Sequence, residues 1–434
     1  MDTLLGILKS KFDLSNIVIE KIKNVVMDSR KIEKNSLFFA INNGNTFIDK
    51  ALEAGAALVI GDNYQGDDPR VIKVENSVKT MQELAREYRK ALKIKIIGIT
   101  GSNGKTTTKD MIHSVLSEKY RCKKTMGNYN NHIGVPYTIL QCEDQDEVLV
   151  LEMGMSGFGE IDELCSISLP DYGVITNIGD SHLEFLKNRA NVCKAKTEML
   201  KYVKPEATIL FGDDYYLKDI PGIKVGCGDS NDFQIKNIVD SEKGLTFDIN
   251  GENYVVALNG RHNAFNAAMA VVIGKLLGMD FKEINRGFEH LFISSMRFEK
   301  VEVGDIIYIN DAYNASPISM GYSLETFGNL YNDRFKIAAL GDMLELGEQE
   351  IKYHEDVIRK ALEMKIDRIF LYGERMKKAL ESIALESRDS DSVKRVTHFE
   401  TKDEIKEAIR KIDGAKAILL KGSRGMKMEE IIEK

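Results

Sequence analysis

The sequence lacks a long hydrophobic run. No stretch of about 18 apolar residues, the length that a membrane-spanning helix needs, occurs in the 434-residue chain. Residues 1–24 are interrupted by charges every few positions, so they lack the apolar core of a signal peptide. We therefore expect neither a membrane span nor a secretory leader.

Positive charge and cysteine are scarce as well. The chain has 60 Lys and Arg residues against 67 Asp and Glu residues, a formal net charge of -7. Nucleic-acid-binding proteins need a basic excess, so we expect no nucleic-acid partner. The five cysteines are odd in number and show no CxxC or other metal-ligand spacing. They predict reduced, mostly buried thiols in a cytoplasmic protein.

Proline is also rare, with 6 residues, and no low-complexity tract or repeat is visible. Compact domains usually have roughly 100–200 residues, so we expect three joined by short linkers. The first border should follow the amphipathic helix 77–93, and the second should fall at a short connection around Ser294–Arg297. We predict an N-terminal domain at 1–92, a central domain at 93–294 and a C-terminal domain at 295–434.

Short apolar runs alternate with amphipathic helical stretches along the chain. This alternation predicts an α/β fold with mainly parallel sheets whose strands are covered on both faces. Segment 232–260 differs, because its Lys-Gly and Asn-Gly turns predict a small antiparallel sheet before a helix at 263–278. The other strands are expected at 36–41, 56–62, 94–100, 147–153, 172–179, 336–341, 368–373 and 417–423.

The most specific local signal is the sequence GITGSNGKTTTKD at residues 98–110. A strand runs into a glycine-rich turn and then a helix, so backbone amides and the helix dipole can cradle phosphates. Lys105 would reach the outer phosphates, and the Thr106 hydroxyl would bind magnesium. An ordinary strand-turn-helix corner is the alternative, and Ile99 stands where a strict P-loop has glycine. The predicted nucleotide-binding residues are Thr100, Gly101, Ser102, Asn103, Gly104, Lys105, Thr106 and Thr107.

Three further chemical groups follow apolar strands. Glu152 ends the strand at 147–153, at the sheet edge where open α/β folds bind ligands. A carboxylate near a phosphate loop is a natural magnesium ligand, although a strand-end acid can also be merely solvated. His182 and Lys196 come after the strand at 172–179, and the residues alone leave open whether they are ligands or ordinary surface side chains.

Asparagines are concentrated in two segments. GNYNNHIGVP at 127–136 offers uncharged donors and acceptors to a polar ligand, or else forms a loop of Asx turns. GRHNAFNAAMA at 260–270 places Asn263 and Asn266 at i and i+3, so both amides face one side of a helix. His262 and Asn263 could equally cap that helix, and the sequence leaves these readings open.

Three polar loops follow strands in the C-terminal third. They are YINDAYNASPISM at 308–320, GDMLELGEQE at 341–350 and LLKGSRGM at 419–426. A solvated loop would explain each one singly, but three at the carboxyl ends of strands in one domain predict a ligand-binding edge. The polar side chains presented there are Asp311, Tyr313, Asn314, Asp342, Lys421, Ser423 and Arg424.

The ordered motifs from residue 98 to residue 426, which also include LEMGMSGFGE, TNIGDSHLEFL and KAKTEML, resemble the Mur ligase family. NYNNHIGVP, DAYNASP and GDMLELGE are similar to the member that adds D-alanyl-D-alanine. The lysine- or diaminopimelate-adding member would carry D-Y-A-H-T-P at Asp311–Pro317, and folylpolyglutamate synthetases D-G-A-H-N-P. The segment DSRKIEKNSLFFAI resembles the family's UDP-binding domain, although the loop NNGNTFIDKAL that follows is shortened.

The resemblance implies a smaller α/β N-terminal domain that holds UDP, a central P-loop-type domain that holds ATP, and a Rossmann-like C-terminal domain. It implies ATP and magnesium as cofactors, with UDP-N-acetylmuramoyl-tripeptide and D-alanyl-D-alanine as substrates. They would be joined through an acyl phosphate by a monomeric enzyme of peptidoglycan synthesis. By position, Thr106 and Glu152 bind one magnesium, while Glu152, His182 and a carbamylated Lys196 bind a second.

The resemblance also assigns further contacts. It makes Lys105 a catalytic residue together with Glu152, His182 and Lys196. It also implies that Asn263, Arg297 and Asp311 contact the nucleotide. The substrate-binding residues it implies are Ser29, Arg30, Asn131, Tyr313, Asn314 and Lys421. A folylpolyglutamate-type ligase and a nucleotide-dependent switch protein are the alternatives; DAYNASP disfavours the first, and Glu152 with the C-terminal polar edge disfavours the second. The sequence does not say whether the third peptide residue is lysine or diaminopimelate.

Overall fold

The computed structural model describes residues 1–386 and 394–433. Its backbone contacts group into two compact units. The first unit comprises Met1–Thr100, Leu116–Ile175 and Ala195–Ile209, and the second comprises Gly101–Val115, Thr176–Lys194 and Leu210–Lys434. The domain borders at residues 92 and 294 stay predictions.

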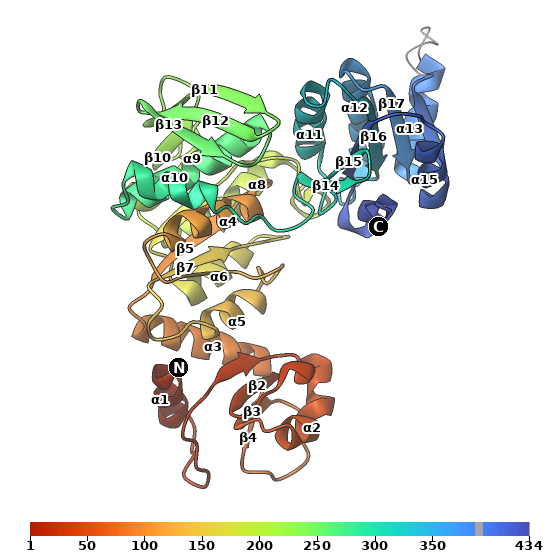
Figure 1. The fold of residues 1–434 in the computed structure, drawn as a ribbon. Coiled ribbons are helices and arrows are strands. Elements are labelled where there is room, and N and C mark those ends of the chain that lie inside the picture. The colour runs from red at the N-terminus through yellow and green to blue at the C-terminus, as the bar shows by residue number, and fades with distance from the viewer. Residues whose placement is uncertain (387–393, 434) are drawn as a thin grey trace. The chain divides into compact units, whose positions relative to one another are not determined.

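The first unit begins with a small parallel sheet (Figure 1). Its strands follow the order of the chain: β1 (Asn24–Val26), β2 (Ser36–Ala40), β3 (Leu58–Gly61) and β4 (Val71–Lys73). Helix α2 (Ile48–Glu53) packs on β3, and its Ile48 shares a buried apolar cluster with Phe38 and Val59. This cluster is the core of the N-terminal part of the unit.

Helix α3 (Ser77–Ala91) follows that sheet in the chain but packs on helices that come later. It contacts α1 (Asp2–Lys11), α5 (Gly134–Leu140) and α6 (Glu160–Ser168). The Tyr88 hydroxyl donates to the Cys142 carbonyl at 2.8 Å, and Arg89 pairs with Asp171 at 2.8 Å. These links join α3 to the larger sheet of the first unit.

The larger sheet presents its polar chemistry at one edge. Its parallel strands lie in the order β6 (Cys122–Lys124), β7 (Val148–Glu152), β5 (Lys95–Thr100) and β8 (Tyr172–Ile175). Every residue of β7 is buried, as expected for a strand covered on both faces. Register pairs Ile99 with Glu152 and Thr100 with Ile175. Because these strands are parallel, their carboxyl ends meet at the same edge.

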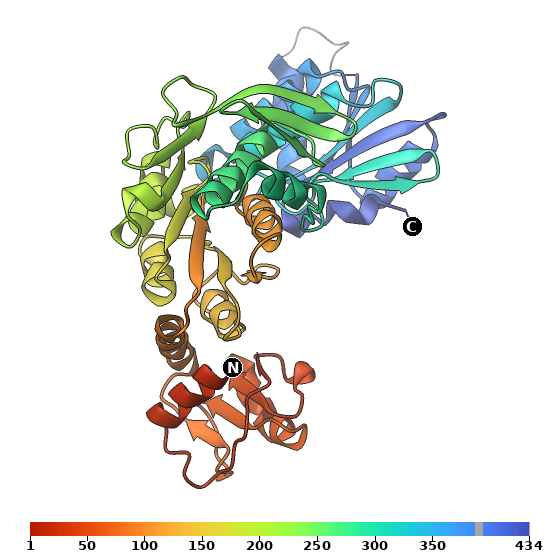
Figure 2. The ribbon, with the colours of Figure 1, turned by 60° about the vertical axis from the view of Figure 1, so that its left-hand side comes forward.

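The second unit contains the predicted antiparallel sheet. Strands β11 (Phe233–Ser241), β12 (Gly244–Ile249) and β13 (Glu252–Val256) pair antiparallel, and β12 turns into β13 at Asn250 and Gly251 with φ of 50° and 84°. Figure 2 shows these strands in green over helices α9 (Arg261–Leu276) and α10 (Phe281–Glu289), which contact them. The prediction for residues 232–260 and for the helix after them is confirmed.

A further sheet forms the C-terminal part of the second unit. Its strands lie in the order β14 (Glu299–Val303), β15 (Ile306–Asn310), β19 (Lys416–Lys421), β16 (Phe335–Gly341), β17 (Arg368–Tyr372) and β18 (Val396–Phe399). The pair β14 and β15 is antiparallel, and the other neighbours are parallel.

Helices cover this sheet on both faces. In Figure 1, α11 (Pro317–Asn329) and α12 (Glu350–Glu363) lie side by side next to the strands. Helix α13 (Glu374–Glu386) contacts α12, and α15 (Lys402–Arg410) packs Ile405 and Ile409 on Tyr308 and Ile418. The polar loops follow the carboxyl ends of strands β15, β16 and β19.

The expected α/β class is confirmed, and each apolar run named above contains a strand. The strands that the sequence analysis did not predict include short or charged ones, such as β6 (Cys122–Lys124) and β14 (Glu299–Val303). Among residues 1–386 and 394–433, no helix combines the length and the apolar character that crossing a bilayer requires.

Candidate active site

At two positions of the glycine-rich loop, any residue other than glycine would strain the backbone and displace a neighbouring side chain. Gly101 and Gly104 have φ of 148° and 81°. A Cβ on Gly101 would lie 1.8 Å from Thr176 Oγ1, and one on Gly104 would lie 2.6 Å from Asn266 Oδ1. Two close approaches therefore fix the loop where the helix α4 (Lys105–Ser117) begins.

Asn103 anchors the loop through its backbone. Its N–H donates to Asn177 Oδ1 at 3.0 Å, while its carbonyl accepts from Thr176 Oγ1 at 2.5 Å and from Asn177 Nδ2 at 3.0 Å. Lys105 Nζ donates to the carbonyls of Gly101 at 2.8 Å and Ser102 at 3.4 Å. The ammonium thus lies against the loop whose amides were predicted to hold phosphates. Thr100 and Thr107, which flank this segment, are buried.

The linker near Ser294 runs along α4. Arg297 Nη2 donates to Thr106 Oγ1 at 2.8 Å, and its guanidinium lies 4.2 Å from the centroid of the Tyr313 ring. Four residues after Thr106, on the same helix face, Asp110 accepts from the Ser294 N–H at 2.9 Å and hydroxyl at 2.7 Å. The structure therefore brings together Thr106, Arg297 and Tyr313, which the sequence analysis placed in the glycine-rich loop, the connection after the central domain and a C-terminal polar loop.

The two asparagines of α9 do face one side, as predicted. Asn266 Nδ2 donates to Asn263 Oδ1 at 3.0 Å, and Asn263 Nδ2 donates to the Asn259 carbonyl at 2.6 Å. Gly260 is the N-cap of α9, so the alternative in which His262 or Asn263 caps the helix is wrong. Asn266 also accepts from Thr108 Oγ1 at 3.2 Å, which joins α9 to α4.

Asp311 and Lys421 form one ion pair, in which Lys421 is buried and Asp311 is partly buried. Lys421 Nζ lies 2.6 Å from Asp311 Oδ2 and donates to the Asn314 carbonyl at 3.2 Å. Asp311 also accepts from the Ser323 hydroxyl at 2.5 Å and the Phe298 N–H at 3.1 Å. Because a buried charge is costly unless it is paired and hydrogen-bonded, these contacts hold both side chains in place. The Asn314 side chain is exposed and accepts from the Ala315 N–H at 2.9 Å.

Glu152 lies in the first unit as a buried carboxylate. Only 3% of its surface is exposed, and its Oε1 accepts from Asn130 Nδ2 at 2.9 Å. Its neighbour in register, Ile99, precedes Thr100 and the glycine-rich loop. The sequence singled out Asn131 rather than Asn130. Asn131 is exposed, and its Oδ1 accepts from the Gly134 N–H at 2.9 Å in an Asx turn at the start of α5.

Lys196 and His182 lie in different units. Lys196 ends helix α8 (Arg189–Lys196), belongs to the first unit and is 1% exposed. His182 belongs to the second unit, has φ of 55°, and places Nδ1 3.4 Å from Glu345 Oε2. The grouping of both with Glu152 around a metal stays a prediction.

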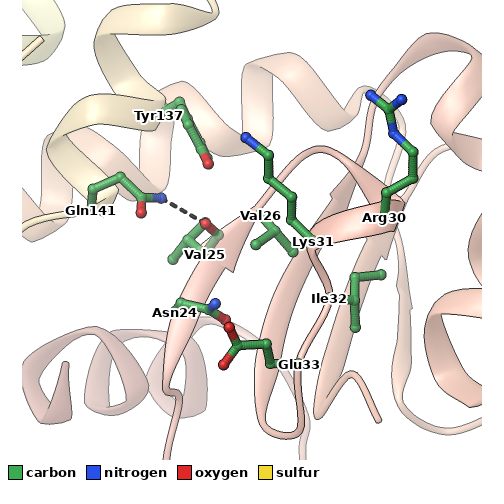
Figure 3. A pocket seen from close by; sticks show the side chains of 9 residues that line it. All are labelled: Asn24, Val25, Val26, Arg30, Lys31, Ile32, Glu33, Tyr137 and Gln141. Atoms are coloured by element: carbon green, nitrogen blue, oxygen red, sulfur yellow. Dashed lines mark hydrogen bonds between the residues drawn. The ribbon is translucent and has the colours of Figure 1, made fainter. Parts of the chain in front are cut away.

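A pocket of about 420 Å³ lies beside the segment predicted to bind UDP. Figure 3 shows Lys31 and Arg30 on one side, and Tyr137 of α5 with Gln141, the C-cap of that helix, on the other. Gln141 Nε2 donates to the Val25 carbonyl at 2.7 Å. The sequence analysis missed Tyr137 and Gln141 because they stand more than 100 positions away from residues 24–33 in the chain. The shortened loop forms a 3₁₀ turn at Asn42–Phe47 and contributes no residue to the pocket lining.

The predicted uridine contacts Ser29 and Arg30 form a local turn. Asp28 caps the 3₁₀ turn Ser29–Lys31 by accepting from the Arg30 N–H at 3.1 Å. The Arg30 side chain also donates to both Asp28 oxygens, and these hydrogen bonds lower the pKa of Asp28 to about 2. Arg30 lines the pocket, whereas Ser29 does not.

His262 is a neutral ring beside the Asp311 and Lys421 pair. Its imidazole stacks on Tyr322 with centroids 5.1 Å apart and planes 16° from parallel. Burial lowers the pKa of His262 to about 4, with Lys421 acting in the same direction and Asp311 opposing it. The unfolded chain therefore binds a proton here at a higher pH than the folded protein does.

This depressed pKa predicts an acid-dependent loss of stability. The contribution of neutral His262 is fully present above about pH 6.5 and is lost as the pH falls towards 4. Between pH 7 and pH 5, wild type should lose about 2 kcal/mol that His262→Gln does not lose, at about 1.4 kcal/mol per pKa unit. Urea unfolding at both pH values measures the difference. The exposed His290→Gln should behave as wild type; equal losses in all three proteins would contradict the prediction.

Most of the chain matches two known family domains. Residues 99–274 match the Mur ligase middle domain, and residues 296–424 match the Mur ligase glutamate ligase domain. A relative from Bacillus subtilis strain 168, UDP-N-acetylmuramoyl-tripeptide--D-alanyl-D-alanine ligase, is 39% identical over 95% of this chain and 93% of its own length. A Borreliella burgdorferi protein of the same name is 31% identical over 95% of both chains.

Solved structures agree with the family matches. MurF from Acinetobacter baumannii superposes with a TM-score of 0.86 at 25% identity, covering 99% of this chain and 97% of that one. The MurF ligase of Thermotoga maritima in complex with ADP gives a TM-score of 0.80 at 27% identity, covering 97% of each chain. With two family domains and a full-length relative at this identity, the chain belongs to the Mur ligase family.

Proposed function

We propose that this chain is an ATP-dependent amide ligase that joins D-alanyl-D-alanine to UDP-N-acetylmuramoyl-tripeptide, giving the pentapeptide precursor of the peptidoglycan cell wall. One observation carries the proposal: 39% identity over 95% of the chain with a relative that bears that name. The DAYNASP and GDMLELGE motifs support the same choice within the family. The enzyme acts as a monomer in the cytoplasm.

The reaction has two steps. The tripeptide carboxylate attacks the γ-phosphorus of ATP, an acyl phosphate forms, and ADP leaves. The amine of D-alanyl-D-alanine then attacks the acyl carbon, and phosphate leaves with the bond electrons while the amine loses a proton. Phosphoryl transfer depends on positioning and charge neutralisation more than on covalent help. Lys105 and Arg297, whose cationic groups contact the loop and Thr106, supply that charge.

The nucleotide would be held by more than the loop. Asn263 lies on α9 and accepts from Asn266, which in turn accepts from Thr108 of α4. The Asn263 amide is therefore hydrogen-bonded, through Asn266, to the helix that follows the glycine-rich loop. Asp311 is partly buried and is fixed by Lys421, which suits an acceptor of fixed orientation for a ribose or base. Both assignments are supported by this geometry and by the family resemblance.

The residues present fit magnesium. Glu152 offers a buried carboxylate and Thr106 a hydroxyl, which are hard oxygen ligands. Among the described residues, no group of three or more His, Cys, Asp or Glu side chains forms an all-protein cage. Magnesium is usually bound by one or two carboxylates together with waters and substrate phosphates. When bound, magnesium neutralises charge on the triphosphate, while Asn130 orients the Glu152 carboxylate at 2.9 Å.

A second cation would use His182 and a carbamylated Lys196 together with Glu152. Lys196 is 1% exposed, and a carbamate on its side-chain nitrogen would offer oxygen ligands to the cation. The dipeptide would bind at Tyr313, Asn314 and Lys421, and the muramoyl group at Asn131. Tyr313 stacks under Arg297, which keeps its phenol near the phosphoryl-transfer residues of the second unit.

Phosphate release tests the proposed function. Release from ATP should require both UDP-N-acetylmuramoyl-tripeptide and D-alanyl-D-alanine, and parallel assays with lysine- and diaminopimelate-containing tripeptides identify the third residue. Release with a folate and glutamate instead would establish the folylpolyglutamate-type alternative. ATP turnover at one rate with and without both acceptors would establish the switch protein.

The pocket beside α5 predicts where the UDP end of the substrate binds. Lys31→Ala should weaken binding of the UDP-linked tripeptide about tenfold, since a hydrogen bond to a charged group is worth about 1.5–3 kcal/mol. Calorimetric titration measures this, and affinity for an ATP analogue should not change. Lys34→Ala, an exposed lysine outside the lining, is the matched control. Equal affinities for Lys31→Ala and wild type would place uridine diphosphate elsewhere.

A further inference from the structure

Ser316 has two hydrogen-bonding roles at the start of α11. It is the N-cap of that helix, and its Oγ accepts from the Ser319 N–H at 3.3 Å. Ser319 Oγ in turn accepts from the Ser316 N–H at 2.9 Å, which completes a capping box. The Ser316 hydroxyl still has its own proton to donate.

That proton goes to the nucleotide loop. Ser316 Oγ lies 2.8 Å from Asn103 Oδ1, a side-chain carbonyl that can only accept. The competing Ser319 Oγ lies farther away, at 3.2 Å. The two partners are 213 positions apart in the sequence, and both belong to the second unit. The contact therefore links α11 directly to the loop that precedes Lys105.

Asn103 is held from two directions as a result. Thr176 and Asn177 bind its backbone, and Ser316 binds its side chain. Its Nδ2 is buried without a hydrogen-bond partner within the described part of the chain, next to Gly179, where a Cβ would lie 3.3 Å from it. Because Oδ1 accepts from the Ser316 hydroxyl, the Asn103 side chain is tied to the N-cap of α11. Ser316 therefore holds the Asn103 amide through its oxygen.

We propose that Ser316 is a positioning residue for the nucleotide, acting through Asn103: it fixes the loop in its phosphate-binding conformation and makes nucleotide affinity depend on α11. This inference rests on the proposed ATP binding. It assigns to the serine of DAYNASP a role that neither the loop motif nor the ion pair of Asp311 contains. Loss of one hydrogen bond in a binding loop should weaken nucleotide affinity about five- to tenfold.

Calorimetric titration with ADP and a non-hydrolysable ATP analogue tests the inference. Ser316→Ala should bind each about five- to tenfold more weakly, and Ser316→Thr, which keeps the hydroxyl, should stay within about twofold of wild type. Asn103→Ala should weaken binding as well. In the Asn103→Ala background, Ser316→Ala should add less than about twofold, because its partner is already gone.

Thr401→Ala is a control for helix capping. Thr401 forms the same capping box on α15, where it exchanges hydrogen bonds with Glu404. Its loss should lower thermal stability about as much as Ser316→Ala does, yet leave nucleotide affinity unchanged. If Ser316→Ala does not fold, Ser316→Gly removes the hydroxyl and keeps most of the capping preference.

The outcomes separate this inference from the proposed function. Wild-type affinity in Ser316→Ala or Ser316→Gly would overturn the role of Ser316, as would an equal loss in the Asn103→Ala background or in Thr401→Ala. If wild type bound neither nucleotide, the proposed ATP-dependent ligase would be overturned, and the inference with it.

Discussion

Lys105→Ala should abolish ligation and leave the fold intact. Its ammonium donates to two loop carbonyls, of Gly101 at 2.8 Å and Ser102 at 3.4 Å. In the proposed reaction it stabilises charge on the transferring phosphoryl group, and removing such a group costs roughly 3–4 kcal/mol of the barrier, or about 10²–10³ in rate. Alanine at the first residue of α4 favours the helix, so the loss should be chemical rather than structural.

Steady-state phosphate release under saturating substrates measures the effect of Lys105→Ala, with thermal unfolding as the check on folding. Lys119→Ala removes an exposed lysine just beyond the same helix and should keep wild-type activity. Binding of the UDP-linked tripeptide should also be unchanged. Activity of Lys105→Ala within about tenfold of wild type, only about 1.4 kcal/mol, would remove Lys105 from the phosphoryl-transfer step.

The loop around Lys105 was predictable because its signal is local. Strand, glycines and helix follow one another within residues 94–117, and the structure forms β5, the loop and α4 in that order. Two glycine positions are explained only by the fold, since Thr176 and Asn266, which approach them, lie far along the chain. Sequence patterns of period 2 or 3.6 carry no information on such approaches.

The sequence could not predict which side chains, far apart along the chain, contact each other in the fold. Arg297 and Thr106 stand 191 positions apart, and Lys421 and Asp311 stand 110 apart, yet each pair forms one contact. The sequence analysis named all four residues, Asp311 and Lys421 at strand ends, Thr106 in the glycine-rich loop and Arg297 in the connection after the central domain, but it could not pair them. The local pattern also failed to choose between two adjacent amides: Asn130 donates to Glu152, whereas Asn131 accepts from the Gly134 N–H at the start of α5. Short strands such as β6 were missed because three residues show no alternation.

Lys196→Met should be inactive in ligation and partly restored by short carboxylic acids. Lys196 is 1% exposed, and the proposed carbamate forms when its neutral amine attacks carbon dioxide, makes an N–C bond and releases a proton. The cation thereby becomes an anionic oxygen ligand suited to magnesium. Methionine has a similar length and apolar stem, so it fills the buried space without the nitrogen and limits the cost of a cavity.

Phosphate release with acetate or formate added tests this rescue directly. Wild type and Lys194→Ala, an exposed lysine on the same helix, should gain nothing from the acids. Carbon-13 NMR with labelled bicarbonate gives a second readout that needs no turnover: wild type and Lys194→Ala should show a carbamate resonance that Lys196→Met lacks. Because the acid replaces only the carbamate oxygens and not the tether, its effect should saturate well below wild-type activity.

Full activity of Lys196→Met without acid would remove Lys196 from the site. A folded but inactive variant with no rescue, from a wild type with no carbamate signal, would mean that the buried ammonium itself is what the reaction requires.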